Sequence, residues 1–372
     1  MKKPINMLDL RAEFALFGEQ VKSAVHRVLE SQQFIGGPDI AELERQVAAK
    51  LGIAEAVAVS NGTDALLCAL MALGVGAGDE VIVPTFTFFA TAGCVHRLGA
   101  KPVFVDIDPA TFCLDPARVR AALTPRTKGI IPVHLYGQCA AMSDLLTIAR
   151  EHRLFVLEDA AQAIGARFNG EVAGGMGELG CLSFYPTKNL GGFGEGGMIL
   201  TRDTALAARC RQLRNHGQSQ QYLHEFVGGN FRLDTLKAAI LLVKLPHWEK
   251  FTRQRQESAA LYDALLKGAP VRTPAVAPGN THVYHQYTID CDRRDELMTF
   301  LKERDIGTAV YYPVPLHRQP CFAHLQCRTE DFPVAEAASR RVLSLPVHPM
   351  LTEEEIRRVA GAIHEFFGSR AR

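Results

Sequence analysis

The sequence predicts an α/β fold with a mostly parallel central sheet that is covered by helices. Short runs of Val, Ile and Leu alternate with amphipathic helical segments over the first two thirds of the chain. Such continuous apolar runs are typical of strands buried on both faces, as in parallel sheets. Polar residues directly follow several of these runs, and ligands of α/β sheets bind beyond the carboxyl ends of the strands. The same pattern therefore predicts a ligand site at that edge.

Composition limits the classes of function that the chain can serve. The 372 residues are 47% hydrophobic and carry a formal net charge of +1, which allows two domains and gives no support to nucleic-acid binding. Nine scattered cysteines lack the spacing of zinc ligands, so they are read as reduced thiols and no metal is expected. The N-terminal residues lack the apolar core of a signal peptide, so none is expected, and no apolar run reaches membrane-spanning length. We expect a cytoplasmic protein with no membrane partner.

The elements of the first half follow from periodicity and turn signals. Helical periodicity covers residues 9–30 and 38–51, with a turn cluster at 33–38 between them. A strand at 56–60 then runs into a small-residue turn and an apolar helix at 65–73. The strands expected next are 80–84, 102–106, 129–134 and 154–158, with helices from about 90 and near 143–152.

A change of composition near residue 245 predicts a domain boundary. Residues 1–245 are expected to form the large α/β domain and residues 246–372 a smaller α+β domain. The large domain is expected to end with helices at about 203–214 and 236–243. The small domain is expected to contain helices near 247–267, 293–305, 333–342 and 352–367, and strands near 282–289 and 308–312.

Three segments carry polar groups at predicted strand ends. In the turn at residues 61–64, backbone N–H groups and Thr63 could bind an anion, or Asn61 or Thr63 could simply cap the next helix. Asp159 ends a buried strand, where it requires a cationic partner such as a protonated pyridine nitrogen, unless it is a helix cap. Among the aromatic residues at 85–89, Phe88 could stack on a flat ring or belong to the core.

A lysine stands between an apolar strand and a glycine-rich loop. Residues 181–185 are apolar, and Lys188 follows them just before five glycines at residues 191–197. Partial desolvation would lower the pKa of this lysine and leave a nucleophilic amine that can form a Schiff base. The alternative is a surface lysine before a flexible loop.

The order of these motifs resembles the fold-type-I pyridoxal-phosphate enzymes, and within them the nucleotide-sugar aminotransferases of the DegT/StrS-like family. The resemblance covers essentially the whole chain. It implies a pyridoxal 5′-phosphate cofactor that passes through a pyridoxamine 5′-phosphate form. It also implies that Lys188 is the Schiff-base lysine and then the acid and base of the proton shift, and that Asp159 pairs with the pyridinium nitrogen.

The resemblance assigns further residues by position. Gln162 is implied to bind the phenolic oxygen of the ring, and Phe88 to stack on the ring. The phosphate contacts are implied to be Gly62, Thr63 and Ser183, joined by Asn230 reaching into the neighbouring subunit, which implies a homodimer with shared sites. The residues suggested to contact the sugar are His216, Arg232 and Tyr312.

The resemblance points most closely to the branch that acts on 3-keto sugars. The segments at residues 61–66, 135–139, 214–218 and 309–316 carry this likeness. The implied reaction moves the amino group of L-glutamate to C3 of a UDP-linked 2-acetamido-3-keto hexose, or its uronic acid, for surface glycan or lipopolysaccharide synthesis. The alternatives are a dTDP-linked 3-keto-6-deoxyhexose, a 4-keto sugar, or a non-catalytic regulatory protein. Lys188 argues against the dehydratase branch, which has histidine at that position.

Overall fold

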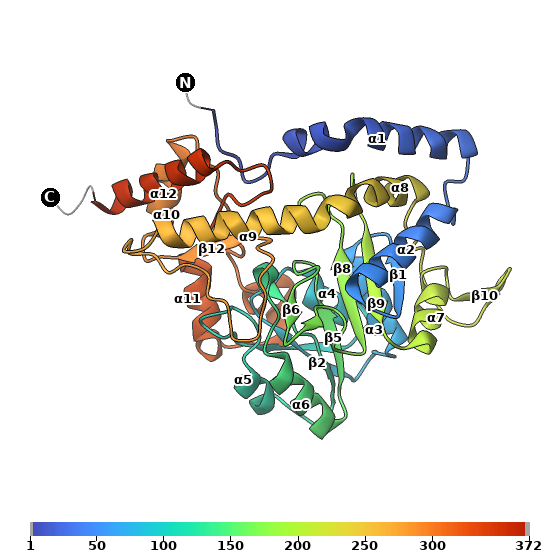
Figure 1. Cartoon of the computed structure of the whole chain (residues 1–372). Coiled ribbons are helices and arrows are strands. Elements are labelled where there is room, and N and C mark those ends of the chain that lie inside the picture. Colours follow the sequence, from blue (N-terminus) through green and yellow to red (C-terminus); the bar gives the residue numbers. More distant parts are fainter. Residues whose placement is uncertain (1–2, 369–372) are drawn as a thin grey trace.

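A computed structural model describes residues 3–368 of the chain, and its helices surround one central sheet (Figure 1). The strands of this sheet are β1 (Glu55–Val59), β2 (Glu80–Pro84), β3 (Lys101–Val105), β4 (Thr127–Ile130), β5 (Phe155–Asp159), β8 (Leu179–Ser183) and β9 (Gly197–Thr201). They lie in the order β1-β9-β8-β5-β4-β2-β3. Only β9 runs against its neighbours β1 and β8, and the other pairs are parallel. The predicted mostly parallel α/β sheet is confirmed.

Helices pack on both faces of the sheet and account for the buried apolar runs. On one side, α3 contacts β8, β9 and β5, with α4 and α7 beside it, and on the other side α5 and α6 lie together below β4 and β5 (Figure 1). The α-helices among the described residues are α1 (Leu10–Ser31), α2 (Pro38–Leu51), α3 (Gly62–Ala72), α4 (Ala90–Arg97), α5 (Pro116–Ala121), α6 (Met142–His152), α7 (Thr204–Leu213), α8 (Thr235–Lys244), α9 (Trp248–Leu265), α10 (Arg294–Lys302), α11 (Pro333–Arg341) and α12 (Glu353–Gly368). None of them is long and apolar enough to cross a bilayer.

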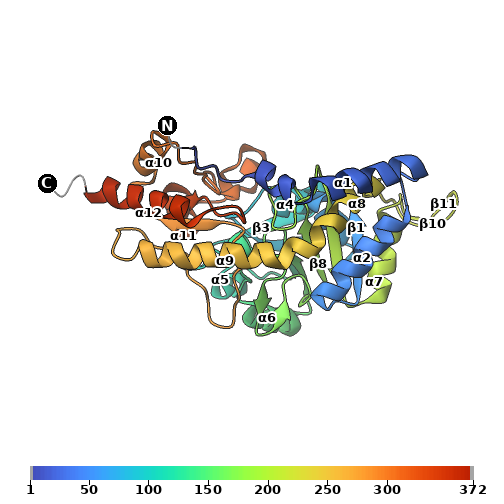
Figure 2. The ribbon, with the colours of Figure 1, turned by 45° about the horizontal axis from the view of Figure 1, so that its top comes forward.

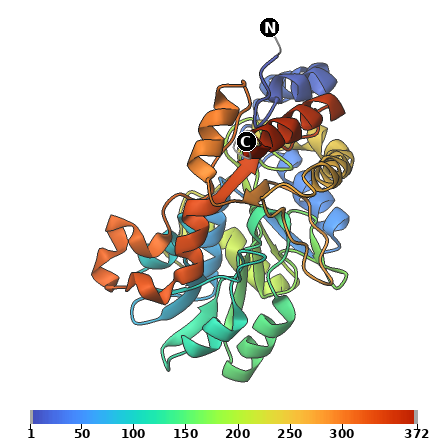
Figure 3. The ribbon, with the colours of Figure 1, turned by 90° about the vertical axis from the view of Figure 1, so that its left-hand side faces the viewer.

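The C-terminal part of the chain forms a second, smaller core. Strands β12 (Tyr287–Asp290) and β13 (Val342–Leu345) pair antiparallel, and α9, α10 and α12 pack around them (Figures 2 and 3). Ile5 joins this core from the other end of the sequence, whereas Phe322 and Phe332 pack into the core of the large sheet. The boundary at residue 245 stays a prediction.

Three predicted strands differ clearly from the structure, and proline explains two of the differences. The third, expected near residues 282–289, begins only at Tyr287 as β12. The strand expected at 129–134 ends at Ile130, because Pro132 has no N–H for the ladder and only Val133 forms a further bridge, to Asp159. The strand expected at 308–312 is absent, and within that range only Ala309 forms a bridge, to Ser344. Prolines at 313 and 315 follow this segment. The strand that pairs with β12 is β13 instead.

Strands β9 and β13 and two hairpins were not predicted. The hairpins are β6 (Arg167–Phe168) with β7 (Glu171–Val172), and β10 (Gln218–Gln220) with β11 (Leu223–His224). The β10–β11 hairpin projects from the body of the molecule (Figure 1). Its strands are two and three residues long, too short to show an alternating apolar pattern.

Candidate active site

A cavity of about 790 Å³ lies beyond the carboxyl ends of β2, β5 and β8. This is the edge of the sheet where the sequence predicts ligand binding. The predicted site residues that line the cavity are Gly62, Thr63, Phe88, Asp159, Gln162, Ser183, Lys188 and Tyr312. The fold therefore brings together residues that lie up to 250 positions apart in the sequence.

A close-packed turn forms the floor of the cavity at the start of α3. Asn61 caps the helix, because its side-chain oxygen accepts a hydrogen bond from the N–H of Asp64 at 2.8 Å. A Cβ added to Gly62 would lie 2.8 Å from the Cβ of Ser183, and one added to Gly197 would lie 2.4 Å from the carbonyl carbon of Asn61. Because Gly62 and Gly197 have no side chain, the turn can pack directly against β8 and β9. The helix N-terminus at this turn can bind a phosphate group.

Asp159 is buried at the end of β5, with 5% of its surface exposed. Its carboxylate accepts hydrogen bonds from the Thr91 hydroxyl at 2.8 Å and from the N–H of Ala161 at 3.2 Å. Burial raises the pKa of this carboxyl group, and the two hydrogen bonds and the charge of Lys188 oppose the shift. No α-helix begins at Asp159, so the alternative of a helix cap is excluded. The carboxylate can accept a protonated ring nitrogen.

Gln162 joins two parts of the cavity wall. Its side-chain oxygen accepts a hydrogen bond from the N–H of Tyr136 at 2.7 Å, and its amide donates to the hydroxyl of Tyr312 at 3.0 Å. Burial raises the pKa of the Tyr312 phenol, which therefore stays neutral. The exposed ring of Phe88 lies 6.3 Å from that of Tyr312, between ring centres.

Lys188 supplies a basic nitrogen to the cavity. Burial lowers the pKa of its amine from 10.5 to about 8, while the negative charge of Asp159 acts in the opposite direction. A substantial fraction of the amine is therefore neutral, and thus nucleophilic, near physiological pH. The loop after it is tightly folded, since a Cβ added to Gly191 would lie 2.3 Å from the carbonyl oxygen of Pro186. Lys188 therefore lines the cavity and does not lie on the outer surface of the protein.

A buried hydrogen-bond network around Glu158, the neighbour of Asp159 in β5, was not predicted from the sequence. Glu158 is fully buried, and its Oε1 atom accepts hydrogen bonds from the N–H groups of Met176 and Gly177 at 2.6 and 2.7 Å. Its Oε2 atom accepts from the N–H of Gly174 at 2.7 Å and lies 2.8 Å from Nε2 of His134. This network ties the end of β5 to the turn before β8. The signal available in the sequence was an acidic residue inside a buried strand.

Three residues that the resemblance places in the site lie outside this cavity. Asn230 and His216 are exposed, and Arg232 donates a hydrogen bond to the side-chain oxygen of Asn215 at 2.6 Å. Their roles in cofactor and sugar binding stay predictions.

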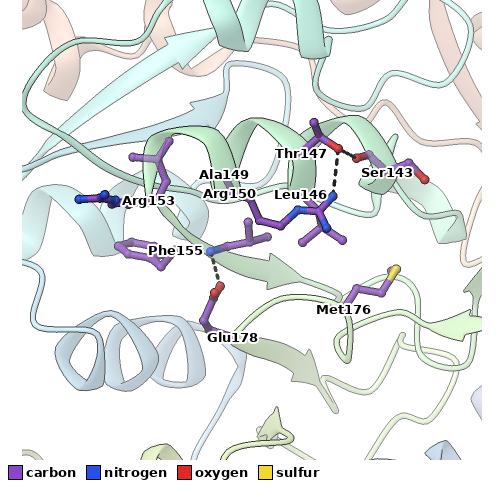
Figure 4. A pocket seen from close by; sticks show the side chains of 11 residues that line it. Ser143, Leu146, Thr147, Ala149, Arg150, Arg153, Phe155, Met176 and Glu178 are labelled. Atoms are coloured by element: carbon purple, nitrogen blue, oxygen red, sulfur yellow. Dashed lines mark hydrogen bonds between the residues drawn. The ribbon is translucent and has the colours of Figure 1, made fainter.

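A second hollow, of about 840 Å³, lies on the far side of the sheet beside α6 (Figure 4). Arg150, Arg153 and Glu178 line it, but Arg150 contacts Thr147 and Glu178 accepts a hydrogen bond from the N–H of Val156. This hollow is at the amino ends of the strands, away from Lys188. The cavity at the carboxyl ends is therefore the candidate active site.

The residues of that cavity fit pyridoxal 5′-phosphate. The close-packed turn at Gly62 suits the phosphate, the buried carboxylate of Asp159 suits a protonated ring nitrogen, and Lys188 has the neutral amine for covalent attachment. Gln162 and Phe88 offer a polar contact and an aromatic surface for the ring.

Comparisons with known proteins agree with this site. The model of the DegT/DnrJ/EryC1/StrS aminotransferase family matches residues 16–364. A pleiotropic regulatory protein of Geobacillus stearothermophilus is 50% identical over 98% of both chains. A UDP-N-acetyl-3-dehydro-α-D-glucosamine 3-aminotransferase of Acidithiobacillus ferrooxidans is 47% identical, covering 96% of this chain and 97% of its own. A UDP-2-acetamido-2-deoxy-3-oxo-D-glucuronate aminotransferase of Pseudomonas aeruginosa is 45% identical, covering 96% and 99%.

Solved structures show the same fold. The crystal structure of Streptomyces venezuelae DesV in complex with a ketimine intermediate has a TM-score of 0.96 and 42% identity, covering 98% of this chain and 99% of its own. Members of this family use pyridoxal 5′-phosphate. Because the family model spans nearly the whole chain and its relatives match from end to end, this protein belongs to the DegT/DnrJ/EryC1/StrS aminotransferase family.

Proposed function

We propose that the protein transfers the amino group of L-glutamate to C3 of a UDP-linked 2-acetamido-3-keto hexose. L-Glutamate leaves as 2-oxoglutarate and the keto sugar becomes a 3-amino sugar, so that the carbonyl oxygen and the amino group exchange places without an external oxidant or reductant. The observation that carries the proposal is the meeting of Lys188 and Asp159 in one cavity beside the close-packed turn at Gly62. The names of the Acidithiobacillus and Pseudomonas relatives support the choice of sugar.

The chain's own residues would hold the cofactor in a fixed orientation. Gly62, Thr63 and Ser183 would bind its phosphate at the start of α3, and Gln162 would contact the ring oxygen while already held by Tyr136. Bound there, pyridoxal 5′-phosphate supplies the electron sink for the carbon from which a proton is removed. Asp159 would help the ring to accept electrons by keeping its nitrogen protonated. The positive charge of that nitrogen would in turn offset the cost of burying the Asp159 carboxylate.

Lys188 would carry the proton between the two reacting carbons. Its lowered pKa lets the amine accept a proton from one position and return it to the other near neutral pH, as general acid–base catalysis requires. Because Lys188 is partly buried, few water molecules compete with the amine for that proton.

The alternatives differ in the sugar and in the class of protein. The alternative substrates are a dTDP-linked 3-keto-6-deoxyhexose and a nucleotide-linked 4-keto sugar. The uronic acid is the form of the proposed UDP-linked sugar that has a carboxylate at C6. A non-catalytic regulatory role, suggested by the name of the Geobacillus relative, would not require Lys188, Asp159 and Gln162 to line one cavity. We also propose a homodimer in which Asn230 reaches the neighbouring subunit's phosphate, and a role in surface glycan synthesis.

The experiment that tests this proposal offers the enzyme L-glutamate with each of several nucleotide-linked keto sugars. The panel contains UDP-2-acetamido-3-keto-glucose, its uronic acid, a dTDP-3-keto-6-deoxyhexose and a UDP-4-keto sugar. Formation of 2-oxoglutarate and of the amino sugar is followed by mass spectrometry. We expect the fastest turnover with a UDP-linked 3-keto sugar. Turnover restricted to the 4-keto sugar would overturn the assignment of C3.

A further inference from the structure

We infer that His317 is a positioning residue that fixes part of the cavity wall from outside the cavity. Its contact with Thr85, directly after β2, holds Tyr312 against Gln162, the residue proposed to contact the ring oxygen of the cofactor. His317 itself does not line the cavity. The inference rests on the proposed function, because that function gives Gln162 its contact with the cofactor.

Three hydrogen bonds join His317 and its neighbour Leu316 to the end of β2. The Nδ1 atom of His317 lies 2.7 Å from the hydroxyl oxygen of Thr85, which also accepts the backbone N–H of His317 at 3.2 Å. Because that oxygen accepts the backbone hydrogen, the hydrogen of the hydroxyl itself is free to bond Nδ1. The carbonyl oxygen of Thr85 accepts the N–H of Leu316 at 2.7 Å. We call this set of contacts the Thr85–His317 anchor.

The Thr85–His317 anchor is buried among apolar side chains. Thr85, His317 and Glu336 are 0%, 6% and 4% exposed, and the ring of His317 stacks on that of Phe332 with 4.3 Å between the ring centres. Nε2 of His317 lies 3.2 Å from Oε1 of Glu336. Buried polar and charged groups of this kind often stabilise a fold no more than well-packed apolar side chains would, but their hydrogen bonds require one arrangement. We therefore assign the anchor a role in fixing geometry.

The short segment between Tyr312 and the anchor is stiff. Residues 313 and 315 are prolines, whose rings fix the backbone angle φ, and a proline also restricts the residue before it, so Tyr312 is constrained as well. Few backbone torsions are therefore free between the cavity and the anchor. On the other side, the hydroxyl of Tyr136 donates a hydrogen bond to the carbonyl oxygen of Tyr311. Tyr312 is thus held in place from both directions along the chain.

The position of Tyr312 determines how Gln162 meets the cofactor. The amide of Gln162 donates to the hydroxyl of Tyr312 at 3.0 Å, and its side-chain oxygen accepts the N–H of Tyr136 at 2.7 Å. These two contacts leave one amide hydrogen of Gln162 for the ring oxygen of the cofactor. A displaced Tyr312 would turn that hydrogen away from the ring. His317 therefore influences the charge on the ring oxygen without touching the cofactor, as supporting residues behind a binding site do.

The test follows the absorption of cofactor-loaded variants as a function of pH. Thr85→Val and His317→Phe each break the anchor, and the second keeps the stacking on Phe332. A ring oxygen that loses a hydrogen bond keeps more negative charge and holds the neighbouring imine proton more firmly. Both variants, like Tyr312→Phe, should therefore raise the midpoint pH of the absorption change by about half a unit or more, the effect of one hydrogen bond. Thr85→Ser, which retains the hydroxyl, should restore the original midpoint.

A double variant separates positioning from general damage to the fold. If the anchor acts through Tyr312, the midpoint of Thr85→Val combined with Tyr312→Phe equals that of Tyr312→Phe alone. The matched control is Thr201→Val. Thr201 is 1% exposed, and its hydroxyl donates to the carbonyl oxygen of Glu178 at 2.7 Å. Its loss should lower the thermal stability and leave the midpoint unchanged.

An unchanged or lowered midpoint in Thr85→Val, or shifts that add in the double variant, would overturn the inference. If thermal unfolding shows that Thr85→Val does not fold, His317→Phe carries the same comparison with Tyr312→Phe. The proposed function fails separately, because the midpoint requires only bound cofactor. In that case the unaltered holoenzyme would convert none of the keto sugars with L-glutamate.

Discussion

Burial acts in opposite directions on the two ionisable residues at the centre of the site. It lowers the pKa of Lys188 and raises that of Asp159, so each group is pushed towards its neutral form while their mutual attraction favours the charged forms. Groups with such shifted pKa values are characteristic of catalytic sites. A bound cofactor would relieve the cost of burial for both groups. Its positive ring nitrogen would pair with the Asp159 carboxylate, and covalent attachment would remove the free amine of Lys188.

The lowered pKa of Lys188 predicts the pH dependence of covalent cofactor attachment. Only the neutral amine can attack the aldehyde of pyridoxal 5′-phosphate, so the attachment rate of cofactor-free protein should rise with pH and level off with a midpoint of about 8. Borohydride reduction followed by peptide mass spectrometry measures the fraction of protein with covalently attached cofactor. In the control variant Lys188→Ala, no cofactor should become covalently attached at this position. A midpoint near the ordinary lysine value of 10.5 would contradict the burial of this amine.

The substitution Asp159→Asn should lower the activity of the enzyme but raise the thermal stability of the cofactor-free protein. Loss of the carboxylate is expected to lower turnover by at least about a hundredfold, because the ring nitrogen loses its charged partner. The raised pKa means that folded Asp159 binds protons more tightly than the unfolded chain, so its contribution to stability falls as pH rises above the ordinary value of 3.8. The cofactor-free variant should therefore unfold at a higher temperature than the unaltered protein at pH 7.

The matched control for this prediction is Asp115→Asn. Asp115 caps α5 by accepting the N–H of Ala117 at 2.8 Å, and asparagine is an equally good cap. Both the activity and the thermal stability of that variant should stay unchanged. A catalytically normal Asp159→Asn enzyme would refute the role given to the carboxylate.

At the level of elements, the site depends on how closely the start of α3 approaches β8 and β9. This approach is possible because Gly62 and Gly197 have no side chains where Ser183 and Asn61 lie against them. The contact explains why a glycine-rich loop after Lys188 must end in Gly197 at the first position of β9. The turn that would receive the phosphate is thus shaped by a strand that follows the lysine.

Gly197→Ala tests that contact. A Cβ there would lie 2.4 Å from the backbone of Asn61, which cannot move aside as a flexible side chain could. We expect a loss of about 1–3 kcal/mol in the free energy of unfolding and at least a tenfold weaker affinity for pyridoxal 5′-phosphate, measured by thermal unfolding and by absorption titration. Gly361→Ala, at an exposed position in α12 with open space around it, should instead stabilise the protein slightly. Unchanged cofactor affinity in Gly197→Ala would contradict the importance of this turn.

The elements that the sequence predicts well are those with a strong local pattern. Helices α1 and α2 and strand β2 lie within a residue or two of their expected limits, because amphipathic periodicity and continuous apolar runs mark them. Strand β13 was missed because Val342–Leu345 follows α11 directly, with no turn signal between them. The segment at 308–312 reads as a strand, but Tyr312 instead turns into the cavity.

The candidate site could be predicted where a residue has a distinct chemical role at a strand end. Lys188, Asp159 and Gln162 belong to this group. The Glu158–His134 pair could not be found in this way, since it depends on a contact between two separate strand ends and carries no local motif. Burial of a polar residue is a property of the fold, and a single sequence does not display it.

At the scale of the whole molecule, the residues implied in binding but absent from the cavity lie together near the β10–β11 hairpin. Asn230 pairs with Asn215 in an isolated bridge, and Arg232 donates to the side chain of the same residue. Tyr222 and Val227, in the same stretch, are 86% and 92% exposed. An exposed apolar surface of this kind favours contact with a second copy of the chain, as the proposed shared sites require.

Mixing two inactive variants tests the proposed sharing of sites. If Asn230 completes the site of its neighbour, a dimer of one Lys188→Ala subunit and one Asn230→Ala subunit contains one intact site and one doubly defective site. Random re-association of equal amounts would form about half mixed dimers, and should restore about a quarter of the unaltered activity. Activity that stays at the level of the separate variants after exchange, with mixed dimers verified by native mass spectrometry, would contradict shared sites.

The central claim is that one cavity built around Lys188 exchanges amino groups between L-glutamate and a UDP-linked 3-amino sugar. The most direct measurement is an absorption titration of the cofactor-loaded protein with L-glutamate and with UDP-2-acetamido-3-amino-glucose, using a UDP-4-amino sugar for comparison. We predict that L-glutamate and the 3-amino sugar each bleach the long-wavelength band of the lysine-bound cofactor, and that the 4-amino sugar does not. A protein that takes up no cofactor, or whose band responds to neither L-glutamate nor the 3-amino sugar, would contradict the claim.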